Sequence, residues 1–337
     1  MNPYIKFRDM KADEKVQTVV LLVSVEERET RTPGKYYCQL TLSDGEQEIG
    51  AKLWNCTKAE VAVPERSLIS AEIYPKIYKE ELSFEVYSYG PAPGEANLED
   101  FIITAPYPSE EMYSMILSCL RKEIPGTSET MDLIHLVENI YAANKTKLLY
   151  WSAAKAVHHN CYGGLLYHTL RMLKTAAMMR FVYPDSYDKE VLLCAVALHD
   201  IGKLQELETD SLGVSDYSVD GSLFGHTLLG ISVIDQEVAA AKEVAKLQPE
   251  TDTYDPEKVR MLKHAIAAHH GNLEWGAITL PATPEAMLLH EIDMIDSRMY
   301  QYENHYKTIE AGKMTDRIYS LNGTRVYKPN YLDKEGL

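Results

Sequence analysis

Short runs in which apolar and polar residues alternate fill the first 90 residues, and this period of two is typical of β-strands. Five such runs lie at residues 16–25, 36–42, 48–54, 67–73 and 82–87. The tripeptide Ser43-Asp44-Gly45 between the second and third runs predicts a hairpin turn. A short helical pattern at residues 57–63 ends at Pro64. This region therefore predicts five strands, with one short helix between the third and the fourth.

From residue 127 the apolar positions recur every three to four residues, which is the period of a helix with one buried face. Helices are predicted at residues 128–142, 146–157, 164–181, 188–198, 224–247, 256–269 and 284–302. Between the two patterns, Gly90-Pro91-Ala92-Pro93-Gly94 predicts a domain boundary. Residues 98–123 predict one or two connecting helices, and no helical period continues after Gly312.

These patterns predict a multi-domain protein in which an all-β barrel precedes an all-α helical bundle. Five strands and one short helix in this order are the plan of an OB-fold, which we assign to residues 1–93. A linker with short helices is expected at residues 94–126, the bundle at residues 127–311 and a C-terminal tail at residues 312–337.

An OB-fold barrel commonly binds single-stranded nucleic acid by stacking bases on aromatic side chains. Tyr36, Tyr37 and Trp54 are the candidates for this role. Residues 1–93 hold 12 Lys and Arg against 15 Asp and Glu, a net charge of −3, so no strongly basic surface is predicted. A barrel that serves interaction or oligomerisation is therefore the alternative, and a homo-oligomer is expected.

Composition and charge limit the class of protein and the kinds of partner that are expected. A hydrophobic content of 45% over 337 residues is enough for two cores, and the net charge of −16 argues against a broad surface for duplex nucleic acid. The sequence contains no apolar run of about 18 residues and no apolar leader, so we expect a soluble, cytoplasmic protein without a membrane partner. The five cysteines form no C-x-x-C pair and are expected to be reduced packing residues.

Candidate chemistry gathers in the helical half, because ten of the eleven histidines fall after residue 150. His199 and Asp200 follow an apolar run, and a buried carboxylate needs a metal or a strong hydrogen-bond partner. One divalent ion takes about four to six ligands including water, so seven side chains in order predict two ions with Asp200 as the bridge. These candidate ligands are His168, His199, Asp200, His226, His269, His270 and Asp293. Single histidines such as His135, His264 and His305 are more often structural.

The order of these ligands resembles the HD-domain metal-dependent phosphohydrolases, whose pattern H…HD…D is matched by His168, His199-Asp200 and Asp293. The additional histidines resemble those of the members that carry a second metal. The surrounding motifs are similar to those of the YhaM-type 3′-to-5′ exoribonucleases, and the resemblance covers nearly the whole chain. The motifs that carry this similarity are GGLLYHTL at 163–170, HDIGK at 199–203, YSVDGSLFGH at 217–226 and HHGNLEWG at 269–276. The barrel adds GKYY at 34–37 and AKLW at 51–54.

The resemblance implies a metal-dependent enzyme that hydrolyses single-stranded RNA, or also single-stranded DNA, from the 3′ end to nucleoside 5′-monophosphates. Mixed imidazole and carboxylate ligands favour Mn²⁺, and Fe, Co, Ni, Zn and Mg stay open. Arg171 lies one helical turn after His168, and Lys203 follows Asp200 by a turn, so both are expected to contact a substrate phosphate. Asp200 is the expected catalytic bridge, and His159 is expected to contact the substrate.

Two residues near Asp293 are candidates for orienting the ligands, and three other functions stay open. His290 and Asp296 lie one turn either side of Asp293 and are expected to orient the ligands. The first alternative is a cyclic-dinucleotide phosphodiesterase of the HD type. Those enzymes resemble the motif H-H-E-x-x-D-G-x-G-Y-P, and the sequence after His270 lacks its Gly-Tyr-Pro. A nucleotide phosphohydrolase would leave the barrel unexplained. A nucleic-acid-binding protein with a non-catalytic bundle would be expected to have lost ligand positions.

Overall fold

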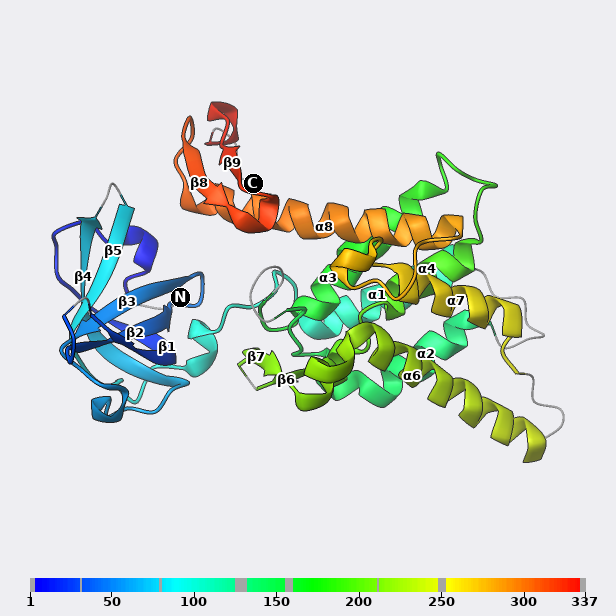
Figure 1. The fold of residues 1–337 in the computed structure, drawn as a ribbon, viewed down its shortest axis with the longest axis horizontal. Coiled ribbons are helices and arrows are strands. Elements are labelled where there is room, and N and C mark those ends of the chain that lie inside the picture. The colour runs from blue at the N-terminus through cyan, green and yellow to red at the C-terminus, as the bar shows by residue number, and fades with distance from the viewer. Residues whose placement is uncertain are drawn as a thin grey trace. The chain divides into compact units, whose positions relative to one another are not determined.

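The structure is a computed structural model that describes residues 4–30, 32–78, 81–124, 132–154, 160–210, 212–247 and 253–333. The chain divides into two compact units, Met1–Thr104 and Ala105–Leu337. Figure 1 shows the first as a β-barrel and the second as a helical unit. In the described part of the chain, no helix combines the length and the apolar character needed to cross a membrane.

The first unit is a closed barrel with the strand order β1-β2-β3-β5-β4, which confirms the predicted OB-fold. Antiparallel pairs make up this barrel except where β3 and β5 run parallel at Ala51 and Phe84. Alternate residues of β2, such as Leu40 and Leu42, point inward and are buried. The strands are β1 (Val16–Glu29), β2 (Tyr36–Ser43), β3 (Glu48–Trp54), β4 (Ser67–Tyr78) and β5 (Glu81–Pro91).

Two predictions for the barrel differ from the structure. The helix expected at 57–63 is only a 3-10 turn, η2 (Lys58–Glu60), capped by reciprocal bonds between Thr57 and Glu60. Two β-branched valines and Pro64 follow this turn and disfavour its extension. β1 and β4 run beyond their predicted ends because polar residues such as Glu29 still pair with a neighbouring strand.

The second unit is a bundle of helices, as predicted. Within it, the long helix α8 lies along the unit, and the β8–β9 hairpin stands at its C-terminal end (Figure 1). α6 contains a kink at Gly225, where φ is 69°. The helices are α1 (Ser109–Glu123), α2 (Leu133–Leu148), α3 (Gly164–Met179), α4 (Lys189–Leu198), α5 (Lys203–Glu206), α6 (Val219–Leu247), α7 (Pro256–Ala268) and α8 (Pro284–Thr308).

The helices predicted at 128–142 and 146–157 do not form as expected. α2 passes through the position of the expected break, since Asn144 bonds its side chain back to the carbonyl of Ile140. The helix then ends at Leu148, and residues 151–154 are not helical. There the Trp151 indole donates to the carbonyl oxygen of Lys203 at 2.8 Å, so a contact 52 residues away outweighs the local helical pattern.

Two small hairpins were not predicted. Leu207–Thr209 (β6) pairs with Ser215–Tyr217 (β7) beside the candidate site. In the C-terminal region Met314–Ile318 (β8) pairs with Thr324–Tyr327 (β9). The sequence carries a signal for the second hairpin, because Asn322 and Gly323 both have a positive φ, and Asn-Gly is a typical turn dipeptide.

Candidate metal centre

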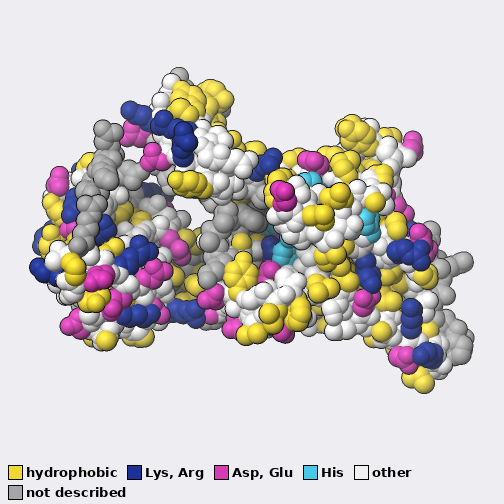
Figure 2. Space-filling model, in the orientation of Figure 1, with side chains coloured by type: hydrophobic (Ala, Val, Ile, Leu, Met, Phe, Trp, Pro, Cys, Tyr) yellow, Lys and Arg dark blue, Asp and Glu magenta, His cyan; other side chains and the backbone are white. Residues whose placement is uncertain are grey.

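All seven predicted ligands lie together in the second unit, although they come from five helices or helix ends. His168 is on α3, His199 and Asp200 follow α4, and His226 is on α6 immediately after its kink. His269 and His270 follow α7, and Asp293 is on α8. Figure 2 shows that histidine side chains of this unit reach the molecular surface.

The close packing of this site depends on Gly202 in the turn after Asp200. A Cβ atom at this position would lie 1.9 Å from the carbonyl oxygen of His226. Glycine therefore allows the turn that carries Asp200 to approach α6 without a steric clash. This explains physically why a glycine follows the His-Asp pair by two positions.

The first group of candidate ligands is buried. One donor atom each of His168, His199 and Asp200 lies within 4.8 Å of the others. His168 Nε2 is also 3.3 Å from Asp293 Oδ1. His168 and His199 are 0% exposed and Asp200 is 4% exposed, so bulk water does not solvate this group.

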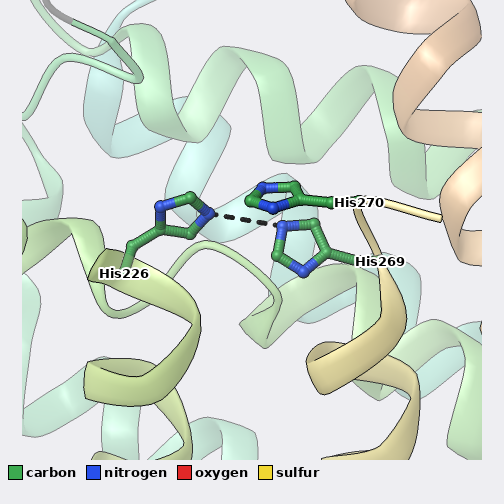
Figure 3. Close-up of side chains that lie close together, drawn as sticks. All are labelled: His226, His269 and His270. Carbon is green, nitrogen blue, oxygen red and sulfur yellow. Dashed lines mark hydrogen bonds between the residues drawn. The ribbon is translucent and has the colours of Figure 1, made fainter. Parts of the chain in front are cut away.

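The second group consists of His226, His269 and His270, whose donor atoms also lie within 4.8 Å of one another. In Figure 3 the imidazole of His226 faces those of His269 and His270 from the opposite side. Its Nε2 atom is 3.3 Å from His269 Nε2.

Asp200 connects the two groups through its two carboxylate oxygens. Oδ1 lies 3.4 Å from His226 Nε2 in the second group. Oδ2 lies 3.2 Å from His199 Nε2 and 3.7 Å from His168 Nε2 in the first group. The carboxylate therefore has the position that a ligand shared by two ions requires.

Hydrogen bonds at Nδ1 orient three imidazoles. His199 and His269 donate Nδ1–H to the carbonyl oxygens of Val196 and Ile266, at 2.9 and 2.7 Å. His226 Nδ1 bonds Glu206 Oε1 at 2.9 Å. Because these acceptors hold the hydrogen at Nδ1, a neutral ring presents the lone pair of Nε2 to the cluster, as a metal ligand must.

Glu206 is the functional residue that sequence reasoning missed. Its Oε1 also accepts a hydrogen bond from the backbone N–H of His226 at 3.0 Å, so one carboxylate holds both the ring and the backbone of that residue. The two residues are 20 positions apart, and no local pattern links them. Asp296 bonds His168 Nδ1 and His290 bonds the carbonyl of His269, so both lie against candidate ligands. Their orienting roles stay predictions.

The protonation states favour a cation at this site. Burial would raise the pKa of Asp200, but His199 and Lys203 hold it well below its usual value. Burial would lower the pKa of His168, but hydrogen bonds to Asp293 and Asp296 raise it to about 9, so its surroundings favour positive charge. Burial and the neighbouring histidines lower the pKa of His269, which keeps this imidazole neutral.

Lys203 and Arg171, both expected to contact phosphate, are bonded to carboxylates. Lys203 Nζ lies 2.8 Å from Asp200 Oδ2 and is itself buried. The Arg171 guanidinium bonds Asp296 and forms a two-point contact with Glu303 at 2.7 and 3.1 Å. Arg171 thus reaches His168 through Asp296, and a direct contact of Arg171 with substrate stays a prediction.

The candidate nucleic-acid contacts of the barrel lie on two faces. Tyr37 and Trp54 pair across β2 and β3, with ring centroids 5.1 Å apart, and point away from the core. Lys52 lies over the Trp54 ring at 5.5 Å. Tyr36 has the opposite parity and does not belong to this pair. His159, the remaining candidate, lies outside the described residues.

The side chains fit divalent ions by the chemistry of their donors. Imidazole nitrogens and a carboxylate oxygen are the donors of the first group, and imidazole nitrogens are those of the second. This mixture of donors suits Mn, Fe, Co, Ni or Zn. Within the described residues, His199 Nε2 is buried without a hydrogen-bond partner. Such an atom is costly unless it serves as a ligand.

Comparisons with known proteins agree with this geometry. Residues 165–298 match the model of the HD domain family. A protein named 3′-5′ exoribonuclease YhaM from Oceanobacillus iheyensis is 30% identical over 319 residues, which are 94% of this chain and 95% of that protein. Proteins of the same name are 31% identical in Bacillus velezensis, over 88% of this chain and 90% of that protein, and 28% identical in Bacillus subtilis, over 92% and 94%.

Proposed function

The chain belongs to the family of YhaM-type 3′-5′ exoribonucleases, and we propose that it is a metal-dependent enzyme that shortens single-stranded RNA from the 3′ end. The products are nucleoside 5′-monophosphates. The observation that carries this proposal is the meeting of seven imidazole and carboxylate ligands from distant positions of the chain, joined by Asp200.

Two divalent ions per chain, with Mn²⁺ as the first choice, are the proposed cofactors. His168, His199, Asp200 and Asp293 would hold one ion, and His226, His269, His270 and Asp200 the other. When bound, such a pair activates a water molecule and neutralises the charge that develops on the leaving 3′-oxygen.

The protein's own residues align the site. Glu206, Asp296 and the carbonyls behind His199 and His269 fix the direction of four of the five imidazoles, all except that of His270. Lys203 donates to the bridging carboxylate and adds one positive charge beside the place of the scissile phosphate. These contacts exist before substrate binds, so little reorganisation is needed during the reaction.

The barrel is the proposed grip for the strand. Tyr37 and Trp54 offer an exposed stacking platform, and Lys52 adds a positive charge over the Trp54 ring. Stacking tolerates any base, which suits an enzyme that removes successive nucleotides. The alternative of a purely interacting barrel predicts that these side chains do not affect RNA binding.

The test uses purified full-length protein and single-stranded RNA and DNA labelled at the 5′ end. With Mn²⁺ we expect a ladder that shortens from the 3′ end and mononucleotides that comigrate with 5′-monophosphate standards. Excess chelator should stop the reaction, and Mn²⁺ in excess of the chelator should restore it. Shortening that is insensitive to chelator, or no shortening with any of the candidate metals, would contradict the proposal.

The cytoplasmic location and the homo-oligomeric state stay predictions. Sizing of the native protein by light scattering tests the second, because one chain has a mass of 38.2 kDa.

A further inference from the structure

A pocket of about 620 Å³ extends from the candidate metal centre along α8. Its inner end is lined by His269, His270 and Asp293, and its outer part by Trp275, Arg298 and Asn322 among others. This volume is within the range of sites that bind small molecules or single nucleotides. The pocket is therefore large enough for more than the scissile phosphate.

One face of α8 forms a wall of this pocket. Asp293, Ser297 and Arg298 line it within two turns of the helix. Arg298 follows Asp293 by five residues, which corresponds to about 7.5 Å along the helix axis. The position of Arg298 on α8 is thus about one and a half turns beyond Asp293 along the pocket.

Arg298 differs from Arg171 in its partners. Arg171 is neutralised by two carboxylates, Asp296 and Glu303. Arg298 is exposed, and no hydrogen bond or ion pair of its side chain occurs among the described residues. An unpaired guanidinium in a chain with a net charge of −16 is suited to bind an anion, since its planar fork matches phosphate oxygens.

Trp275 stands on a loop that is attached to the same site. It is 55% exposed, and its ring lies 6.1 Å from that of His290 at an angle of 35°. The loop approaches His290 so closely that a Cβ atom on Gly271, where φ is 71°, would lie 2.3 Å from the imidazole. His290 in turn bonds the carbonyl of His269. The indole is therefore held at a defined position beside the metal ligands.

The C-terminal hairpin contributes to the outer end of the pocket. Ser320, Leu321 and Asn322 line it, and the Ser320 hydroxyl bonds the side chain of Gln301 on α8. Leu321 is buried, so this contact is part of the packed unit. The tail region thus shapes the pocket.

We propose that this pocket binds the nucleotide on the 5′ side of the scissile bond. Arg298 pairs with the 5′-phosphate of that nucleotide, and Trp275 stacks on its base. This inference rests on the proposed exoribonuclease function and adds the residues that recognise the strand next to the cut. A terminal nucleotide with a free 3′-hydroxyl carries only the scissile phosphate, so a second phosphate contact has to involve the strand that remains.

The critical experiment compares UpU with 5′-phosphorylated pUpU as substrates of the full-length protein in Mn²⁺. The two dinucleotides share their bases and the scissile bond, and differ only in the 5′-phosphate. We expect wild type to hydrolyse pUpU with a kcat/KM about ten-fold higher, mainly through a lower KM, because a charge-assisted contact is gained on binding. Arg298→Met should remove this preference, so that the kcat/KM for pUpU falls about ten-fold to the level of UpU.

Arg260→Met is the matched control, because it removes the same charge from an exposed arginine of α7 that lies outside the pocket. It should keep the wild-type preference, and Arg298→Lys should retain part of it. A loss of UpU hydrolysis in Arg298→Met, with wild-type thermal stability, would instead place Arg298 at the scissile phosphate and overturn the assignment. An unchanged preference for pUpU would also overturn it.

Trp275 is tested by removing the base that it is proposed to contact. Trp275→Ala should raise the KM for pUpU about ten-fold, and Trp275→Phe should restore most of the loss. On a dinucleotide with an abasic 5′ residue, Trp275→Ala should have no further effect. An equal loss on the abasic and the normal substrate would contradict the stacking contact.

Binding in chelator separates this inference from the proposed function. Fluorescence anisotropy with a short labelled RNA should show weaker binding for Arg298→Met than for Arg260→Met, although no hydrolysis takes place. If wild type cuts no RNA with any metal, the exoribonuclease proposal fails while this binding difference stands. If wild type cuts RNA but the two variants behave alike, only the pocket assignment fails.

Discussion

The barrel and the helical unit differ in how many charged and titratable side chains they bury around one point. In the barrel, the buried Glu85 pairs with Lys76. Ion pairs of the barrel such as Lys58–Glu65 and Arg28–Glu26 are exposed on both partners. In the helical unit, a buried cluster brings together carboxylates and imidazoles around Asp200, which also contacts the buried Lys203.

Exposed charged side chains mainly interact with water, whereas the buried cluster around Asp200 is a candidate for chemistry. An exposed ion pair contributes about 0–1 kcal/mol and can be exchanged with little consequence. A buried ion costs several kcal/mol in desolvation unless its partners are well placed. The helical unit bears this cost in the cluster around Asp200 and also at Glu123 and Glu190, which pair with Lys189 and Lys258. Several carboxylates and imidazoles meet in the cluster, whereas the barrel offers Trp54 on its surface. We therefore expect variants in the two units to affect different steps.

Asp200→Asn should have the largest effect. Activity should fall on the order of a thousand-fold or more, because both ligand groups lose their shared oxygen donor. Lys203 would be left buried without the carboxylate that it bonds, so thermal stability should also fall. The double variant Asp200→Asn/Lys203→Met should recover stability without recovering activity. Thermal unfolding and bis(p-nitrophenyl) phosphate hydrolysis measure both properties, and an active double variant would refute the bridging role.

His226→Ala should have the next largest effect and should act on one ligand group only. It removes one of three imidazoles of the second group, so we expect the loss of one of two ions per chain and a fall in turnover of about a hundred-fold. Elemental analysis after dialysis measures the metal. His264→Ala is the control, since His264 accepts a hydrogen bond from the N–H of Ala282 and is not in the cluster. Two ions and full activity in His226→Ala would show that His226 is structural.

Arg171→Gln distinguishes two roles of this arginine. If it acts through Asp296 on His168, the affinity for metal should fall about ten- to a hundred-fold and the KM for RNA at saturating metal should stay the same. If Arg171 instead contacts substrate directly, as the sequence suggests, the KM for RNA should rise and the affinity for metal should stay the same. Metal titration followed by kinetics at saturating Mn²⁺ decides between them.

Trp54→Ala should have the smallest effect and one confined to long substrates. We expect about ten-fold weaker binding of a long single strand, because one stacking platform is lost, and unchanged hydrolysis of bis(p-nitrophenyl) phosphate. Tyr36→Ala is the control from the other face of β2. Equal binding by wild type and Trp54→Ala would favour the interaction role of the barrel.

The periodicities were sufficient for most of the fold, because they reflect which residues must face a core. They were insufficient where a distant contact competes with the local pattern. Residues 151–154 read as helix, but Trp151 bonds the carbonyl of Lys203 instead. The C-terminal hairpin is a different case, because no distant contact hides it. Its turn signal, Asn322-Gly323, is present in the sequence and was not interpreted as a hairpin.

The candidate site shows the same division. His199 and Asp200 were readable because a histidine and an aspartate have few other reasons to follow an apolar run together. The remaining ligands were predicted from the order that resembles the HD-domain phosphohydrolases. Glu206 was not readable, since an acidic residue near a turn has many uses and its contact to His226 spans 20 residues. The neutralisation of Arg171 by Asp296 and Glu303 spans 125 and 132 residues.

By itself the sequence determined the two kinds of architecture, because these follow from the period of apolar residues, and it predicted a set of donors from residue type and from the family resemblance. Only the tertiary structure decided which ring nitrogen faces the cluster and which oxygen of Asp200 lies toward each group. It also decided that Arg298 lines the pocket without a partner among the described residues. These features depend on the direction of single side chains. That direction is set by packing and hydrogen bonds between segments far apart in the chain, and no local pattern contains it.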